Sequence, residues 1–187
     1  MASAQATTNV NNSTASTMAA VANEFLRLQR EDHGYPVIDQ MKLQKLLFYA
    51  HAWYMAYNER RPLFDDDFEA WPWGPVVRDA YLQTLDCGKG PVEAPLSELA
   101  ENSGGFQFRT PDGVFDDLKP FIRSVWDTHK QFSGIQLSNS THADGEPWTV
   151  VKDRYGSLEG KPKIPNNLIA EVFERKLADV TANPAAG

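Results

Sequence analysis

The amino-acid sequence predicts a mainly α protein: a compact single-domain helical fold with one small β-hairpin. Apolar residues recur at helical spacing in about six or seven segments, whereas alternating apolar residues flank turn residues in one segment, residues 104–115. The length of 187 residues, of which 42% are hydrophobic, suits one domain with a single core, and no internal repeat is visible.

The two ends of the chain differ from its middle. Residues 1–16 are small, polar and uncharged, which predicts a disordered tail, and residues 182–187 predict a flexible C-terminal tail. We expect the domain to span residues 17–181. Its first helix is predicted over residues 17–30, and His-Gly-Tyr-Pro at residues 33–36 ends it, because residues before a proline avoid the α conformation.

A second helix is predicted over residues 41–57, with Asp39 as its N-cap. Apolar residues cover nearly its whole circumference, and this pattern is typical of a central, buried helix. The polar exceptions Lys42, Gln44 and Lys45 cluster at its N-terminal end. We therefore expect that end of the helix to reach the surface.

Residues 68–77, Phe-Glu-Ala-Trp-Pro-Trp-Gly-Pro-Val-Val, cannot form an ordinary helix or a central strand. Pro72 fixes φ near −65° between the two tryptophans, and Gly74 is free to adopt a sharp entry conformation. Pro75 suits the first position of a helix because it lacks a backbone N–H. The segment therefore predicts a rigid aromatic turn that starts a helix running from Pro75 to about residue 87.

Further elements are predicted in the second half of the chain. Turn residues flanked by alternating apolar positions indicate the hairpin, and apolar stripes at helical spacing indicate the helices. In chain order these elements are a short helix at residues 97–102, the hairpin at 104–115, and helices at about 120–132, 148–155 and 164–179.

The charge and hydropathy of the chain disfavour two classes of partner. The formal net charge is −7, and residues 92–117 carry six acidic residues against the single base Arg109. Nucleic acid is therefore an unfavourable partner, and so is regulation of the chain's own operon. The most apolar run, residues 46–57, is too short to span a bilayer, which disfavours a membrane. An acidic protein favours a basic partner, although solubility alone also explains the charge.

The residues that commonly carry catalysis or bind metals form no recognisable constellation. None of the four histidines has the spacing of a helical metal-binding pair, and the single cysteine, Cys87, excludes an internal disulfide or a cysteine-rich zinc site. We predict no catalytic residue, no metal and no cofactor. The alternative is a small hydrolase or transferase that uses His142 with a carboxylate or with Cys87. Without a secretory signal at the N-terminus, a cytoplasmic protein is expected.

Three segments together resemble one family. They are Met-Lys-Leu-Gln-Lys-Leu-Leu-Phe-Tyr-Ala-His-Ala-Trp-Tyr-Met at residues 41–55, the aromatic turn at 68–77, and Leu-Ser-Asn-Ser-Thr-His-Ala-Asp-Gly-Glu-Pro-Trp at 137–148. In this order and at these separations they are similar to the Panacea domain of SocA-like and GepA-like proteins, over roughly residues 18–175. The resemblance implies an antitoxin that neutralises a cognate protein toxin by binding it. SocA-like members also act as adaptors that deliver the toxin to a ClpXP-type protease, which makes such a protease a second candidate partner.

The resemblance supplies candidate binding and structural positions but no catalytic residue. Glu69 is expected to be the counter-charge of Lys45. Trp71 is expected in the core beneath the buried helix, and Trp73 is expected to be exposed near the partner. The alternative is that all three segments form one buried cluster. The candidate partner-binding residues are Lys42, Gln44, Lys45, Trp73, Thr141, His142 and Trp148, and the structural ones are Glu69, Trp71, Gly74 and Pro75.

Overall fold

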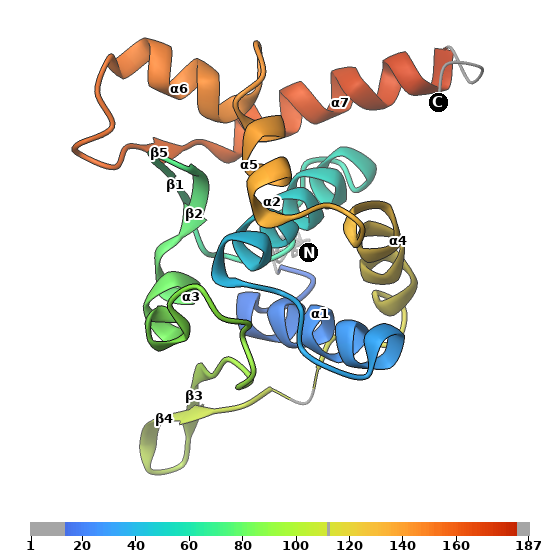
Figure 1. The fold of residues 1–187 in the computed structure, drawn as a ribbon, viewed down its shortest axis with the longest axis vertical. Coiled ribbons are helices and arrows are strands. Elements are labelled where there is room, and N and C mark those ends of the chain that lie inside the picture. The colour runs from blue at the N-terminus through green and yellow to red at the C-terminus, as the bar shows by residue number, and fades with distance from the viewer. Residues whose placement is uncertain (1–13, 112, 183–187) are drawn as a thin grey trace, which may run out of the picture.

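The computed structural model describes residues 14–111 and 113–182 (Figure 1). Most of the predicted N-terminal tail, and all but the first residue of the predicted C-terminal tail, lie outside the described residues. Within them helices dominate, which confirms the mainly α fold. In chain order the elements are α1 (Met18–His33), α2 (Gln40–Tyr57), β1 (Phe68–Trp71), β2 (Gly74–Val77), α3 (Arg78–Gln83), the 3-10 helix η1 (Leu85–Cys87), β3 (Glu98–Asn102), β4 (Gly105–Arg109), α4 (Lys119–His129), α5 (Gly134–Thr141), α6 (Pro147–Tyr155), β5 (Lys163–Ile164) and α7 (Asn166–Ala182).

Helix α2 is the centre of the fold. The Asp39 side chain accepts a hydrogen bond from the backbone N–H of Lys42 at 2.7 Å and caps the helix as predicted. Helices α1, α4, α5 and α7 all pack against α2, and Figure 1 shows it at the middle of the molecule. Leu46, Leu47 and Phe48 follow one another along the chain and are all fully buried. This confirms the prediction of a helix that is buried nearly all round.

The aromatic turn connects two strands and does not start a helix. Strands β1 and β2 are antiparallel, with Trp71 opposite Gly74, and β5 pairs with the other edge of β1. The expectation that this segment contains no central strand is therefore wrong for residues 68–71, because Pro72 lies in the turn and leaves the backbone N–H groups of β1 free to pair. The predicted helix from Pro75 is therefore wrong, because residues 74–77 form β2 and α3 begins only at Arg78. Pro75 fits an edge strand as well as a helix start, since a missing N–H is tolerated in both places, and the two valines that follow favour a strand.

A second hairpin, β3–β4, projects from the body of the molecule (Figure 1). It occupies residues 98–109, so the predicted hairpin at 104–115 lies several residues too late, and the predicted short helix at 97–102 is wrong. The turn explains the shift. The side chain of Asn102 accepts a hydrogen bond from the backbone N–H of Gly104 at 2.8 Å, and Gly105 has a φ of +120°, a conformation that favours glycine.

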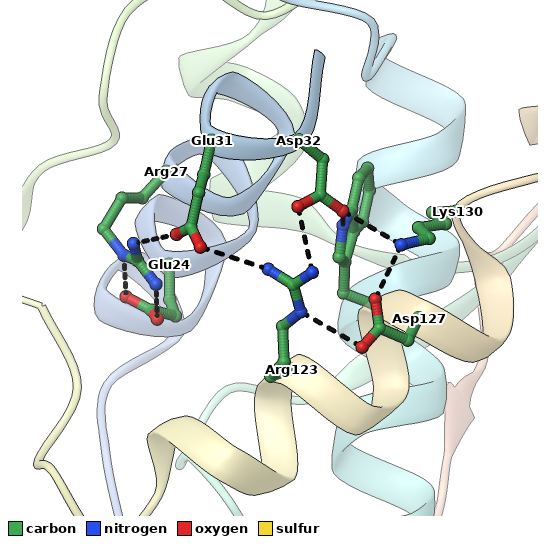
Figure 2. Close-up of polar contacts among 8 residues, drawn as sticks. Glu24, Arg27, Glu31, Asp32, Arg123, Asp127 and Lys130 are labelled. Carbon is green, nitrogen blue, oxygen red and sulfur yellow. Dashed lines mark hydrogen bonds and ion pairs between the residues drawn. The ribbon is translucent and has the colours of Figure 1, made fainter. Parts of the chain in front are cut away.

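An ion-pair network fastens α4 to α1 (Figure 2). The guanidinium of Arg123 contacts Asp32 at 2.9 Å and Asp127 at 3.1 Å, and the ammonium of Lys130 contacts the same two carboxylates at 3.0 and 2.8 Å. The indole N–H of the fully buried Trp126 also donates to Asp32 at 2.9 Å. This hydrogen bond, together with the two cations, lowers the pKa of Asp32 to about 2. The network continues along α1 through Glu24, Arg27 and Glu31.

Candidate functional site

The three segments singled out in the sequence meet at the β1–β2 turn. From α5, the hydroxyl of Ser138 donates to the carbonyl oxygen of Trp73 at 2.8 Å. From α6, the indole N–H of Trp148 donates to the carbonyl oxygen of Trp71 at 2.8 Å. From α2, the ammonium of Lys45 reaches the strand that follows the turn. The turn is therefore held by side chains from three helices.

Polar side chains of α2 cover the outer edge of strand β2. The amide of Gln44 accepts a hydrogen bond from the N–H of Val77 at 2.8 Å and donates to its carbonyl oxygen at 3.2 Å. The Lys45 ammonium donates to the carbonyl oxygen of Pro75 at 2.9 Å. These side chains make the hydrogen bonds that a neighbouring strand would otherwise make. Their role at the edge explains why polar residues stand on a buried helix.

The expectation that the start of α2 reaches the surface is wrong. Lys42, Gln44 and Lys45 are all buried, with Lys45 only 1% exposed. The Lys42 ammonium donates to the carbonyl oxygen of Lys130 at 2.7 Å, so it too satisfies a backbone group. The expected pair of Lys45 with Glu69 is also wrong, because the Glu69 carboxylate binds Arg78 at 2.9 Å. Backbone carbonyls, which a sequence pattern does not reveal, are the partners of these lysines.

Raising the pH from about 7 to about 9 is expected to stabilise the fold through Lys45. Burial lowers the pKa of Lys45 to about 7, whereas an unfolded lysine titrates near 10.4. Between these values the unfolded state binds more protons, so the free energy of unfolding rises with pH, by at most about 1.4 kcal/mol per pH unit. Below the folded-state pKa, Lys45 is protonated in both the folded and the unfolded protein, so its contribution to the free energy of unfolding no longer changes with pH.

Urea denaturation across this pH range measures the effect. The matched variant is Lys45→Met, which keeps much of the side-chain volume but cannot titrate, and it should lose most of the slope. A slope that is equal in the two proteins would show that Lys45 keeps its ordinary pKa in the fold.

The two tryptophans of the turn lie in different environments, and one expectation about them holds. Trp73 is 68% exposed, as predicted. Trp71 is only half-buried and does not lie in the core. Residues of β1 alternate, so Phe68 faces the core whereas Trp71 shares the outer face with Glu69. Its indole donates to Glu69 at 2.7 Å and lies under the ammonium of Lys161, 3.8 Å from the ring centroid.

The segment from α5 to α6 contributes mostly buried groups. Thr141 is fully buried and donates to the carbonyl oxygen of Ser138 at 2.7 Å, and Trp148 is 3% exposed. His142 is half-buried and stacks on the Trp148 ring with 3.8 Å between centroids. Burial and the charges of nearby lysines lower the pKa of His142, which favours a neutral imidazole. Thr141 and Trp148 therefore do not stand at the surface.

Of the seven candidate binding residues, only Trp73 and His142 reach solvent appreciably. The other five are buried; four of them fit the alternative of one buried cluster around the turn, whereas Lys42 contacts Lys130 and Trp126 at the end of α4. Beside Trp73 lies a hollow of about 120 Å³ whose wall also includes Met41 and Tyr81. Neither of these was identified from the sequence. The Tyr81 ring packs 4.7 Å from Trp71, and an aromatic residue so soon after the turn was the available signal.

Cys87 and His142, which the enzyme alternative would pair, belong to different elements. Cys87 lies in η1, His142 follows α5, and no hydrogen bond joins them in the part of the chain that the structure describes. Within the same residues no three histidine, cysteine or carboxylate side chains come together in a way that could hold a metal ion. No helix among them combines the length and apolar character needed to cross a membrane.

Comparisons with known proteins match the chain to a family and to a curated relative. The family model described as "Antitoxin SocA-like, Panacea domain" matches residues 43–149, which run from α2 into α6 and include the turn and both hairpins. The chain is similar to "Antitoxin SocA" of Caulobacter vibrioides (strain NA1000 / CB15N), at 28% identity over 152 residues that cover 80% of this chain and 79% of that protein. No solved structure matches.

Proposed function

Because the chain belongs to the SocA-like antitoxin family with a Panacea domain, we propose that it is an antitoxin that neutralises a cognate protein toxin in the cytoplasm by binding it directly. The observation that carries the proposal beyond the family is the exposed Trp73 on a turn held by three helices. Neutralisation by binding needs a complementary surface and no catalytic group. Delivery of the toxin to a ClpXP-type protease, which the sequence resemblance implies, stays a prediction.

The proposed contact is Trp73 with the hollow beside it. A large aromatic side chain on a rigid turn loses little conformational entropy on binding and contributes much apolar area, as interface hot spots do. The hydrogen bond from Ser138 holds the Trp73 backbone without covering its side chain. His142 lies behind the turn, stacked on Trp148, and we propose a supporting role for it.

Co-expression tests the function. The product of the neighbouring gene is expected to arrest growth when expressed alone, and this protein is expected to restore growth and to form a stable complex with it. Growth curves report rescue, and pull-down with native mass measurement reports the complex. Rescue without a complex would show that neutralisation is not by direct binding.

The Trp73→Ala variant tests the contact. We expect at least about tenfold weaker toxin binding, or about 1.4 kcal/mol, and reduced rescue. The free energy of unfolding should change by no more than about 0.5 kcal/mol, because the side chain is exposed. Tyr155→Ala on α6 is the matched control, since Tyr155 is 60% exposed, and it should bind like wild type. If both variants bound the toxin equally well, Trp73 would not be part of the interface.

A further inference from the structure

The β3–β4 hairpin carries an apolar face that is exposed to solvent. Leu99 on β3 lies directly opposite Phe108 on β4. Phe106 lies two residues before Phe108 on the same strand, so the three side chains share one face. The exposed fractions are 58% for Leu99, 71% for Phe106 and 76% for Phe108. An isolated two-stranded hairpin is only marginally stable in water. Such a face is explained by a partner that covers it.

An acidic groove runs along the base of this face. Its volume is about 400 Å³, and Leu99 and Phe108 line it on the hairpin while Asp66 and Asp79 line it on the body. Burial raises the pKa of Asp66, and the nearby charge of Asp79 raises it further. Among the described residues no basic side chain forms an ion pair with either carboxylate. A cationic side chain entering the groove would relieve this repulsion.

We propose that the hairpin surface, defined as Leu99, Phe106 and Phe108 with Asp66 and Asp79, is a docking site for a segment of the toxin that carries both basic and apolar side chains. The proposal rests on the antitoxin function proposed above and names a second contact of the same partner. The apolar side chains of the segment cover the two phenylalanines and Leu99. A lysine or arginine of the segment enters the groove between the two aspartates.

Helix α3 joins this surface to the Trp73 turn. The amide of Gln83 donates to Asp79 at 2.8 Å and to the carbonyl oxygen of Ser97 at 2.9 Å, which ties α3 to the start of the hairpin. At the other side of α3, Tyr81 packs on Trp71. One partner that covers α3 therefore contacts both surfaces at once.

Binding of the toxin to surface variants tests the proposal. The double variant Phe106→Ser/Phe108→Ser and the single variant Asp79→Lys are each expected to weaken binding by about tenfold or more. The Asp79→Lys effect should shrink at high salt, because charge attraction is screened. The matched controls on α6 are Tyr155→Ser and Asp153→Lys, whose residues are also exposed and which should bind like wild type.

A synthetic peptide gives a readout that does not depend on the toxin. A peptide of alternating lysine and leucine is titrated into the isotope-labelled full chain, and the backbone resonances that shift are mapped. We expect shifts at β3, β4 and the two aspartates, none in the Phe106→Ser/Phe108→Ser variant, and none with the matching peptide of glutamate and leucine.

The outcomes separate the two proposals. If wild type binds the toxin and the hairpin variants bind within about twofold of it, the hairpin proposal is overturned and the antitoxin function stands. If wild type neither binds the toxin nor rescues growth, the proposed function fails, and the peptide map decides whether the surface accepts a basic apolar segment. Peptide shifts elsewhere, or a wild-type dimer that the double phenylalanine variant converts to monomer, would also overturn the hairpin proposal.

Discussion

Replacing Gly74 with alanine is expected to destabilise the protein by about 3–5 kcal/mol, a large part of the 5–15 kcal/mol that a domain of ordinary size possesses. Gly74 has a φ of +101°, which strains any residue with a Cβ atom. A Cβ built there would lie 2.7 Å from the Thr141 hydroxyl and 2.9 Å from the Lys45 ammonium. Neither neighbour can move freely, because both are buried and hydrogen-bonded.

Urea denaturation of Gly74→Ala and Gly145→Ala separates the two causes. Gly145 also has a positive φ, +78°, but nothing lies within 4 Å of a Cβ built on it. The Gly145→Ala change should therefore cost only the backbone strain, about 1–2 kcal/mol. Similar small losses in both variants would mean that the contact of Lys45 and Thr141 with the turn is looser than the distances indicate.

The Trp148→Ala change is expected to cost about 3–5 kcal/mol, as large-to-small core substitutions of tryptophan do. It removes a nearly buried ring, its stacking on His142, and the N–H that satisfies the carbonyl oxygen of Trp71. Trp148→Phe keeps most of the packing and should cost about 1–3 kcal/mol, which is the range for a buried carbonyl left without its donor.

Chemical denaturation gives these free energies, and near-ultraviolet circular dichroism reports the order of the remaining tryptophans. Trp73→Ala is the internal comparison, because Trp73 belongs to the same turn but is exposed. If Trp148→Ala lowered the free energy of unfolding no more than Trp73→Ala does, the Trp148 side chain would not stabilise the turn.

Much of the helical fold follows from the sequence because its signals are local. Asp39 and the all-round apolar pattern predict α2 within a residue of its observed start, and helical spacing predicts α1 and α7. The strand at residues 74–77 could not be predicted in this way. Its identity depends on β1 and on Gln44, which lies 33 residues away along the chain and supplies the missing edge hydrogen bonds. At this strand the long-range contact with Gln44, and not the local propensity of residues 74–77, decides the conformation.

The candidate site was predictable only in part, because some of its features depend on local sequence and others on contacts that the fold creates. The proline between the two tryptophans predicts different environments for their rings, and the exposure of Trp73 is confirmed, although the core position of Trp71 from which it was inferred is wrong. The resemblance implied a core position for Trp71, but residues 68–71 form a strand whose side chains alternate, so Trp71 lies on the outer face with Glu69. Lys42 and Lys45 were misplaced because charged residues usually lie at the surface unless they are paired, and their partners are backbone carbonyls.

The covering of β2 by Gln44 and Lys45 has a consequence for how partners can change over evolutionary time. A strand edge already satisfied by its own helix cannot recruit the main chain of another protein. Recognition next to it is left to side chains on the turn, and exposed side chains can be exchanged singly at a cost within about 0.5 kcal/mol. A scaffold built in this way can acquire a new binding preference by surface substitution while every hydrogen bond that shapes the turn stays in place.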